Sequence, residues 1–385
     1  MAKKKPRPPK SLSAVQPIRG NEGATVLGPT NPARAAESRS RVAPPKTDHG
    51  TLPSLRWSFC DSHNRLSEGG WARQTTVREL PIATEIAGVN MRLKAGAVRE
   101  MHWHEEGEWA YMLKGSARIT LVDQNLRTFQ ADVGEGEGWF FPAGIPHSIQ
   151  GLGPDGCEFL LVFDDGDFDE NSTFQLTDWL ACTPKEILAK NFHTTVSAFD
   201  KIPTEELYIF QTKVPPPLSK DRVLGLGPVP VDLKHRMGKM DPVRMKYGSV
   251  RILDTKLFPP TTISAALVEL EPGALRELHW HPNADEWQYY VSGQGRMTVF
   301  ASNRSAQTFD YLAGDVGYVP RAQPHYVENT GKTTLRFFEM FRSPKFEDVP
   351  LAQWLAFTPH ELVRAHLNID ESLLKKIPKR KMPIT

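Results

Sequence analysis

A nine-residue segment occurs twice in this 385-residue chain, and the repetition restricts the possible folds more than any other feature of the sequence. Gly-Ala-Val-Arg-Glu-Met-His-Trp-His at 96–104 returns as Gly-Ala-Leu-Arg-Glu-Leu-His-Trp-His at 273–281. The interval of 177 residues exceeds the roughly 20 to 50 residues of a solenoid repeat and is long enough for a domain with its own core. We therefore expect two tandem domains with the same fold.

The repeat predicts an N-terminal domain over 53–215 and a C-terminal domain over 216–385. Residues 1–50 differ from both copies, because they contain ten Lys and Arg, three Asp and Glu, eight prolines and no Phe, Trp or Tyr. Such a segment cannot bury enough apolar surface to offset the entropy lost on folding. We expect a disordered, basic, Pro-rich tail over 1–52.

Composition restricts the class of partner. The formal net charge of +2 provides no field that attracts nucleic acid or an anionic membrane, and no stretch is long and apolar enough for a membrane span. Cys60, Cys157 and Cys182 lack the spacing of a zinc site or a disulfide framework, and the N-terminus lacks the apolar core of a secretory signal. We expect a cytoplasmic protein with a small-molecule partner, no nucleic acid and no membrane.

Each copy contains short runs of β-branched, aromatic and aliphatic residues separated by Gly, Pro, Asn and Asp. The runs lie at 116–122, 138–142 and 158–163 in the first copy and at 295–300, 316–320 and 335–341 in the second. This pattern predicts an all-β sandwich or barrel. Helices are expected only afterwards, over 178–191 and 353–367, where Thr183 and Thr358 each precede a proline and could cap a helix.

Three histidines and one glutamate recur at matching positions in both copies. His102 and His104 are two residues apart, which places both imidazoles on one face of a strand, and Glu108 and His147 follow. Such a set is typical of a first-row divalent metal site with positions left for substrate. A lone histidine usually belongs to the core, but six of the chain's 12 histidines occupy matching places. The predicted metal ligands of the second copy are His279, His281, Glu286 and His325.

These motifs resemble the cupin superfamily. Its first motif, a glycine followed by His-x-His, Glu and glycine, is present in both copies, beginning at Gly96 and Gly273. In the second motif Gly151 stands where the family has Asn, and Ala322 stands where it has Gly, but no ligand position is altered. The resemblance implies two tandem cupin barrels, also described as jelly rolls or double-stranded β-helices, each followed by short helices.

A narrower resemblance covers nearly everything after residue 50. The segments 99–111, 141–150 and 169–174 are similar to those of bicupin oxalate decarboxylases. That resemblance implies a lyase that splits oxalate into formate and carbon dioxide, with two Mn(II) ions per chain and with dioxygen that is required but not consumed. It also implies a homo-oligomer, usually a hexamer.

Arg99 and Arg276 lie three residues before the first histidine of each copy. A guanidinium pairs well with a dicarboxylate, so both are candidate substrate-binding and catalytic residues. Strand alternation turns Arg99 away from the face of His102 and turns Glu100 toward it, unless a bulge intervenes. An ion pair with a surface acid is the alternative role for Arg99.

The first copy contains three extra residues between 168 and 179. Phe168 matches Phe346 at an offset of 178, whereas Trp179 matches Trp354 at 175, so the insertion lies within Asp-Glu-Asn-Ser-Thr at 169–173. A short polar insertion is most often a solvated loop. The resemblance instead implies a mobile lid in which Glu170 donates and accepts the proton. The family often has Ser where Asp169 stands.

Glu339 occupies the place of Leu161 of the first copy, among apolar strand residues. A buried acid needs a partner, so Glu339 is either a catalytic proton relay near the second metal or the ion-pair partner of Arg276. Trp103 and Trp280 should face away from the histidines beside them. We expect them to pack a core or a subunit interface, with electron transfer as the other possibility.

The sequence therefore predicts a manganese-dependent oxalate decarboxylase with a dioxygen-dependent radical mechanism. The nearest alternative is an oxalate oxidase, which produces hydrogen peroxide and carbon dioxide and needs the same metal but no proton donor to carbon. Glu170 distinguishes the two. A non-catalytic bicupin storage or ligand-binding protein is the alternative from another class, and eight intact ligands argue against it.

Overall fold

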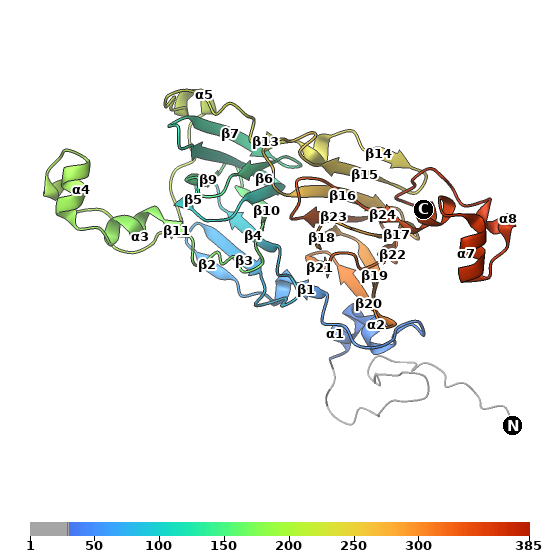
Figure 1. The fold of residues 1–385 in the computed structure, drawn as a ribbon. Coiled ribbons are helices and arrows are strands. Elements are labelled where there is room, and N and C mark those ends of the chain that lie inside the picture. Colours follow the sequence, from blue (N-terminus) through green and yellow to red (C-terminus); the bar gives the residue numbers. More distant parts are fainter. Residues whose placement is uncertain (1–28, 30) are drawn as a thin grey trace. The chain divides into compact units, whose positions relative to one another are not determined.

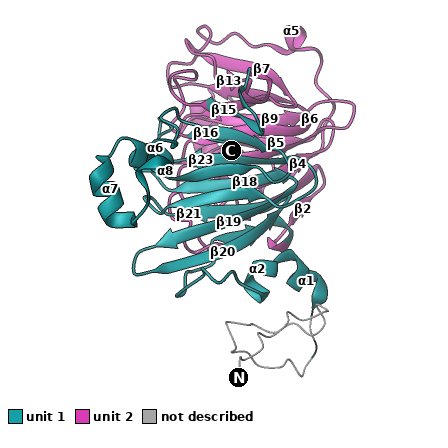
Figure 2. Ribbon diagram, turned by 90° about the vertical axis from the view of Figure 1, so that its right-hand side faces the viewer, with its two compact units in different colours: residues 1–60, 241–252, 264–385 teal, residues 61–240, 253–263 magenta. Residues whose placement is uncertain are grey.

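The computed structural model describes residues 29 and 31–385, which form mainly antiparallel β-strands (Figure 1). The described chain divides into two compact units, coloured separately in Figure 2. The N-terminal barrel comprises Asp61–Met240 and Leu253–Ile263. The C-terminal barrel comprises the described residues up to Cys60, Asp241–Ile252 and Ser264–Thr385. The predicted all-β fold with two barrels is confirmed.

The strands of the N-terminal barrel form one hydrogen-bonded network. They are β2 (Arg65–Ser67), β3 (Gly70–Thr75), β4 (Ala87–Leu93), β5 (Val98–Trp103), β6 (Glu108–Val122), β7 (Thr128–Gly134), β8 (Gly138–Phe141), β9 (His147–Gly151), β10 (Cys157–Phe163), β11 (Phe174–Gln175), β12 (Ile209–Phe210) and β13 (Lys234–His235). The main order is β11-β5-β9-β6-β10-β4-β3-β2. Strand β6 pairs with β8 and β10 up to Gly115 and with β7 and β9 beyond it. The single long strand β6 thus belongs to both sheets of this barrel.

Gly115 is required at the bend of β6. Its φ of +74° lies in the left-handed region, and a Cβ there would approach the Gly156 carbonyl oxygen to 2.0 Å. In the C-terminal barrel the equivalent Gly293 has φ +88°, and it divides the strand into two.

The C-terminal barrel contains two sheets. The first has the order β1-β21-β18-β23-β16-β15-β14 and the second β20-β19-β22-β17-β24. The strands are β1 (Arg56–Ser58), β14 (Val243–Met245), β15 (Gly248–Leu253), β16 (Ser264–Leu270), β17 (Leu275–Trp280), β18 (Glu286–Ser292), β19 (Gln294–Ala301), β20 (Ser305–Leu312), β21 (Asp315–Val319), β22 (His325–Asn329), β23 (Leu335–Phe341) and β24 (Val349–Pro350). Five of the six strand segments predicted from sequence are confirmed to within two residues, whereas the predicted 116–122 is only the second half of β6, which begins at Glu108.

Aromatic and aliphatic side chains fill both barrels. In the N-terminal barrel Trp139, Phe141 and Phe159 are fully buried, and Trp139 and Phe159 pack edge to face with ring centroids 5.4 Å apart. In the C-terminal barrel Tyr290 stacks on Tyr311, with a centroid distance of 4.4 Å. These large rings bury apolar area that stabilises small barrels.

Short helices follow the strands of each copy. They are α3 (Leu176–Ala181), α4 (Lys185–Asn191) and α5 (Leu218–Asp221) in the N-terminal barrel, and α6 (Leu351–Ala356), α7 (His360–Leu367) and α8 (Glu371–Leu374) in the C-terminal barrel. Three 3₁₀ turns are also described, at Phe59–Asp61, Val196–Phe199 and Met237–Lys239. Each predicted helix is therefore two helices.

The threonines before these prolines do not cap the helices that follow, so that expectation is wrong. The Thr183 hydroxyl donates to the Trp179 carbonyl at 2.7 Å, and Thr358 donates to Trp354 at the same distance. Each hydroxyl bonds the last turn of the preceding helix, because a carbonyl left free there is the nearer partner.

The units differ from the predicted domain limits of 53–215 and 216–385. Strand β1 pairs with β21 of the C-terminal barrel, and β13 pairs with β8 of the N-terminal barrel. Within the predicted tail, α1 (Pro32–Glu37) and α2 (Arg39–Val42) are helical, and Thr308 donates to Asp48 at 2.7 Å. Residues 1–28 and 30, the rest of the predicted tail, lie outside the described residues.

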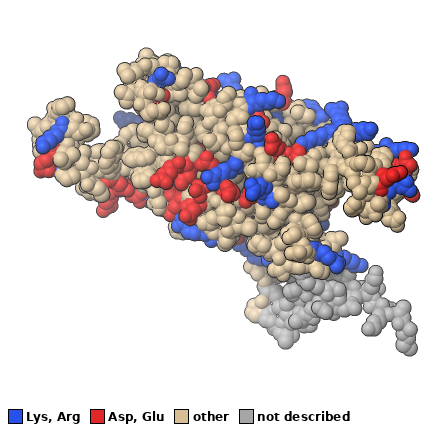
Figure 3. Space-filling view, in the orientation of Figure 1, with Lys and Arg blue, Asp and Glu red and all other residues tan. Residues whose placement is uncertain are grey.

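Two surface properties bear on the class of protein. None of the helices described between residues 31 and 385 is long and apolar enough to cross a membrane. Basic and acidic side chains are both present on the face drawn in Figure 3, where a group of acidic side chains stands out.

Candidate metal centres

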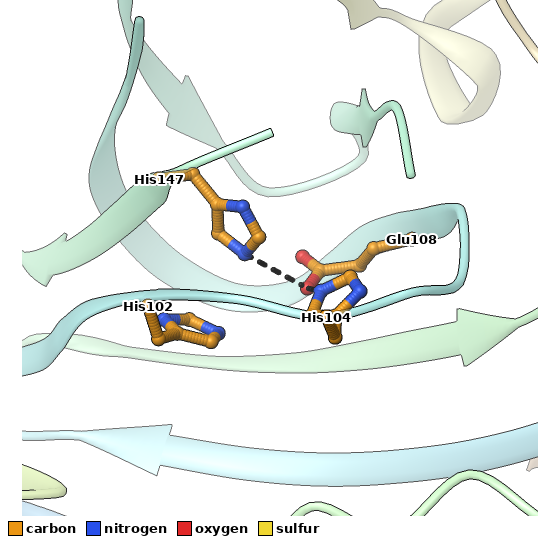
Figure 4. Close-up of side chains that lie close together, drawn as sticks. All are labelled: His102, His104, Glu108 and His147. Atoms are coloured by element: carbon orange, nitrogen blue, oxygen red, sulfur yellow. Dashed lines mark hydrogen bonds and ion pairs between the residues drawn. The ribbon is translucent and has the colours of Figure 1, made fainter. Parts of the chain in front are cut away.

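The four predicted ligands of the first copy meet inside the N-terminal barrel. His102 comes from β5, His104 directly follows β5, Glu108 begins β6 and His147 begins β9 (Figure 4). All four are buried, and one ligand atom from each lies within 4.8 Å of the others. Residues far apart in sequence thus converge on one point, as a metal site requires.

The backbone fixes the orientation of each imidazole. The Nδ1 atoms of His102, His104 and His147 lie 2.7, 2.8 and 2.7 Å from the carbonyl oxygens of residues 100, 106 and 145. A carbonyl oxygen only accepts, so each Nδ1 carries the proton and each Nε2 carries a free lone pair. Such outer hydrogen bonds typically orient metal-binding histidines.

Glu108 completes this set as a carboxylate. Its Oε2 lies 3.3 Å from His104 Nε2 and 3.6 Å from His147 Nε2, while Trp139 Nε1 donates to its Oε1 at 2.9 Å. Burial alone would raise the pKa of Glu108, but positive charge and a proton on Nε2 of His104 and His147, whose place a bound metal cation would take, lower the pKa to about 2. The group is therefore ionised and available as a ligand at neutral pH.

The C-terminal barrel repeats this arrangement. His279, His281, Glu286 and His325 are buried, with ligand atoms within 4.8 Å of one another. Each histidine Nδ1 again lies 2.7 to 3.0 Å from a carbonyl oxygen. The second oxygen of Glu286 is held by Gln288, whose Nε2 donates at 2.7 Å, where the first barrel uses Trp139.

Both clusters fit a divalent cation. In the C-terminal barrel, Nε2 of His279 and Nε2 of His281 lie 3.1 Å apart, and both carry lone pairs that repel each other unless a cation lies between them. In the N-terminal barrel, Nε2 of His147 is buried without a hydrogen-bond partner. Three imidazoles and a carboxylate suit first-row metals, but the donor set alone does not select manganese.

Arg99 reaches the site because of a β-bulge. The pairing of β5 with β9 shifts register between Arg99 and His102, so the strand alternation breaks there. Arg99 is fully buried, while Met101 is 54% exposed. Strand β17 has the same shift between Arg276 and His279.

Glu100 is buried as well but serves another purpose. Its Oε1 accepts from the Thr177 hydroxyl at 2.8 Å, and its Oε2 accepts from the backbone N–H groups of Leu207 and Tyr208 at 2.7 Å. Glu100 thereby ties helix α3 and the segment before β12 to strand β5. These hydrogen bonds of the Glu100 side chain involve none of the four candidate ligands; only its backbone carbonyl contacts His102.

The guanidinium of Arg99 bonds the inserted segment 169–173. Its Nε donates to Glu170 Oε1 at 2.8 Å, its Nη2 to Thr173 Oγ1 at 2.8 Å and its Nη1 to Gln175 Oε1 at 3.2 Å. The ring of Tyr208 lies beneath it, 4.5 Å from the guanidinium carbon. Glu170 itself is buried, although it belongs to a short polar insertion.

The inserted segment is anchored at its start. Asp169 accepts from Gln74 at 2.9 Å and pairs with Arg78 at 2.8 Å, and the backbone N–H of Glu170 donates to Gln74 at 2.9 Å. Partial burial would raise the pKa of Asp169, but the hydrogen bonds from Gln74 and Arg78 hold it well below the usual range. Beside this segment and His104 lies a cavity of about 530 Å³.

Arg276 lies in a more highly charged setting. Its Nε donates to Glu339 Oε1 at 2.9 Å, its Nη2 to Asp348 Oδ2 at 2.8 Å, and its Nη1 lies 3.9 Å from Glu277. Glu339 is thus an ion-pair partner of Arg276, which is one of the two roles that the sequence predicted for it. A role for Glu339 as a proton relay stays a prediction.

The two tryptophans face away from the metal ligands. Trp103 stacks on Phe174 at 5.5 Å between ring centroids and meets Trp179 edge to face at 5.6 Å. Trp280 meets Trp354 edge to face at the same distance. Trp179 and Trp354 are 61% and 57% exposed, so each aromatic group reaches the surface of its unit.

Sequence reasoning missed several residues that complete these sites. Trp139 and Gln288 orient the two glutamates, Gln74 and Arg78 anchor the inserted segment, and Lys381 pairs with Asp348. None of them occupies a fixed position of the repeated motifs. Only Trp139 carried a signal, because a tryptophan buried in a strand needs an acceptor for its N–H.

Known proteins match the chain over nearly all of its length. The cupin family pattern matches residues 60–198 and 237–374. Oxalate decarboxylase OxdC of Bacillus subtilis is 54% identical over 371 residues, 96% of each chain, and a probable oxalate decarboxylase of Arthroderma benhamiae is 39% identical over 98% of this chain and 94% of the relative. A solved structure of the Bacillus subtilis enzyme, from work on its Mn(II) centres, superposes with a TM-score of 0.93 at 53% identity and covers 97% of this chain and 99% of the other.

Proposed function

Because the chain belongs to the cupin family and within it to the bicupin oxalate decarboxylases, we propose that it converts oxalate and a proton into formate and carbon dioxide. The observation that carries the proposal is the buried pair of Arg99 and Glu170 beside the first metal cluster. The guanidinium of Arg99, which can bind an anion, and the carboxyl group of Glu170, which can transfer a proton, are then in direct contact. Oxidation of oxalate would require the guanidinium but not the carboxyl group.

Each barrel is proposed to bind one Mn(II), through the four ligands described above. Manganese bound there supplies coordination positions for oxalate and one-electron redox chemistry, for which dioxygen is required but not consumed. The protein contributes orientation, charge and proton transfer around that ion.

Arg99 binds and orients the substrate carboxylate. Its Nη1 and Nη2 are paired with the neutral side chains of Gln175 and Thr173, which an arriving carboxylate can replace with stronger, charge-assisted bonds. The guanidinium also stabilises negative charge that develops on the substrate. Burial of Arg99 strengthens both effects because water no longer screens them.

The charge of the cavity beside the inserted segment favours a singly charged substrate. It is lined by the acidic residues Glu105, Glu106, Asp167 and Asp169 and by Arg78. This excess of negative charge repels the oxalate dianion more than hydrogen oxalate. We therefore infer that the substrate enters with one proton.

Glu170 transfers that proton. It accepts the proton from hydrogen oxalate, the carbon–carbon bond breaks with release of carbon dioxide, and Glu170 returns the proton to the remaining carbon to give formate. Burial raises the pKa of Glu170, although Arg99 opposes the shift. A raised pKa suits a group that must both accept and donate.

The rival activities predict different products. An oxalate oxidase converts oxalate and dioxygen into hydrogen peroxide and two molecules of carbon dioxide, without protonating carbon. A storage or ligand-binding protein forms neither formate nor peroxide. Formate as the main product from oxalate therefore separates the proposed activity from both.

The test combines metal analysis with product assays. We expect about two manganese ions per chain in purified protein, and His102→Ala and His279→Ala should each remove about one. His102→Ala should also abolish formate production from oxalate. One ion in the unaltered protein, with no loss in either variant, contradicts two metal sites, and peroxide as the main product contradicts the decarboxylase.

We further propose that the protein is a cytoplasmic homo-oligomer, with the hexamer as the expected form. Exposed apolar side chains on the helices of both barrels, or directly after them, support self-association, among them Trp179, Phe192, Trp354 and Phe357. Sedimentation equilibrium measures the assembly, and cell fractionation measures the compartment. A monomer at micromolar concentration contradicts the first part.

A further inference from the structure

The guanidinium of Arg276 is surrounded by carboxylates before any substrate arrives. Glu339 occupies its Nε side, Asp348 accepts from its Nη2, and Glu277 lies nearest to its Nη1. The side chains of Arg276, Glu339 and Asp348 are at most 2% exposed. An oxalate anion approaching Arg276 would therefore meet three negative groups.

The equivalent contacts of Arg99 include one carboxylate only. Thr173 matches Asp348 at the offset of 175, and each accepts a hydrogen bond from Nη2 of its arginine at a distance of 2.8 Å. Both residues accept this hydrogen bond from the guanidinium, so a neutral acceptor in the first barrel is replaced by a carboxylate in the second. The two arginines look alike in sequence but differ in whether an anion can reach them.

A segment near the end of the chain keeps Asp348 in place. Leu275 and Thr385 exchange backbone hydrogen bonds at 2.8 and 2.9 Å, and the N–H of Glu277 donates to the Pro383 carbonyl at 3.0 Å. This pairing brings the ammonium group of Lys381 onto Asp348. Lys381 is 43% exposed at its side chain, so it covers Asp348 from the solvent side.

Lys381 has an opposite counterpart in the first copy. Glu206 matches it at the offset of 175, and Glu206 pairs with Arg65 rather than with a residue of the inserted segment. The second barrel therefore has a cation where the first has an anion. That cation neutralises Asp348 and makes its displacement by oxalate unfavourable.

We propose that Asp348 and Lys381 form a closing pair that excludes oxalate from Arg276, so that each chain binds oxalate in the N-terminal barrel alone. The inference rests on the proposed function, because it takes oxalate as the ligand of the first site. According to this proposal the second barrel holds a metal ion, but oxalate cannot reach Arg276 beside it.

The test counts bound oxalate. Manganese-loaded protein is dialysed to equilibrium against radiolabelled oxalate without dioxygen, and a formate assay confirms that no turnover occurs. We expect one oxalate per chain in the unaltered protein. Asp348→Thr combined with Lys381→Gln removes one charge of each sign, so it should raise the stoichiometry to two per chain while two manganese ions remain bound.

The ion pair of Lys185 with Asp200 provides the matched control, since its atoms lie 3.0 Å apart on the surface of the N-terminal barrel. Lys185→Gln combined with Asp200→Thr should leave one oxalate per chain. Two oxalates in the unaltered protein overturn the closing pair. One oxalate in the doubly substituted protein with both metals present also overturns it, whereas none in any protein refutes the proposed function itself.

A reciprocal change tests the same idea without altering the C-terminal barrel. Thr173→Asp places a carboxylate at Nη2 of Arg99, so oxalate affinity at the first site should fall at least tenfold. Thr173→Asn, which adds similar bulk without charge, should reduce it less. Equal affinities in Thr173→Asp and the unaltered protein overturn the proposal even if the C-terminal variant fails to fold.

Discussion

In each barrel a glutamate accepts a hydrogen bond from Nε of the equivalent arginine, but the two glutamates come from different parts of the fold. Glu170 reaches Nε of Arg99 at 2.8 Å from the inserted segment, whereas Glu339 reaches Nε of Arg276 at 2.9 Å from strand β23. Strand β23 pairs with β16 and β18 on its two sides, so Glu339 is fixed. The contact with the arginine is therefore alike in the two barrels, but Glu170 lies outside any strand, whereas Glu339 lies within one.

From that difference we expect a reactive ion pair in the first barrel and a structural one in the second. A carboxyl group on a surface segment can leave the arginine when substrate arrives and return to deliver a proton. A carboxyl group in the middle of a sheet cannot leave without breaking backbone hydrogen bonds. The comparison teaches that the position of the acid along the chain, more than its distance to the arginine, assigns its role.

The largest expected effect comes from removing the carboxyl group of Glu170. Glu170→Gln retains the size of the side chain but cannot transfer a proton, so formate production should fall by roughly 100- to 10,000-fold. Glu339→Gln should change it far less. Steady-state formate assays measure both, and metal analysis should give two ions per chain in each variant.

Peroxide provides the second readout for this pair. Oxidation of oxalate needs no proton on carbon, so the share of turnovers that end in peroxide should rise in Glu170→Gln. A Glu170→Gln enzyme with near-normal formate production contradicts the comparison and shifts the chemistry to the second barrel.

The next effect concerns stability and should be larger in the second barrel. Arg276→Met leaves Glu339 and Asp348 buried without their partner, which should cost about 3–5 kcal/mol, as for other broken buried ion pairs. Arg99→Met should cost less, because Glu170 can move into water with its segment. Hydrogen exchange of β17 and β5 peptides in metal-free protein measures the two losses separately.

The pH profile sharpens the same contrast. Glu170 must be ionised to accept the proton of hydrogen oxalate, and burial raises its pKa, so this accepting carboxylate is lost at higher pH than for an ordinary glutamate. As pH falls below that raised pKa, Glu170 is already protonated and formate production should fall by about tenfold per pH unit. This limb should vanish in Glu170→Gln and persist in Glu339→Gln, as measured by kcat between pH 4 and 8.

The smallest effect should come from the anchor of the inserted segment. Asp169→Ser removes the ion pair with Arg78, whose side chain is 52% exposed, and such pairs contribute about 0.2–1 kcal/mol. We expect the peroxide share to rise by about fivefold or less, because the segment opens more often. Arg78→Gln should raise the peroxide share by a similar factor. The double variant should raise it little further if Asp169 and Arg78 act only through their ion pair.

The fold and the metal ligands were predictable from sequence because both depend on short-range patterns. Alternating apolar residues predict strands, and two histidines two residues apart share a strand face. Their repetition in a second copy then made a chance grouping implausible. The three-residue offset also located Glu170, since an insertion changes spacing even when its residues are ordinary.

The bulge before His102 was not predictable in the same way. Alternation turns Arg99 outward, and only the register shift between β5 and β9 reverses this. Nor could the contact between Lys381 and Asp348 be predicted, because it depends on how the last residues pair with β17. Features that arise when distant segments meet leave no periodic signal in the chain.

Strand β1 has a consequence for the order in which the protein forms during synthesis. Arg56 of β1 pairs with Asp315, 259 residues later in the chain. At about 5–20 residues per second, a ribosome needs very roughly 13–52 s to make that interval. The strand with Trp57 therefore waits unpaired while the N-terminal barrel is completed, and a chaperone that binds exposed strands should be found on chains stalled before residue 315.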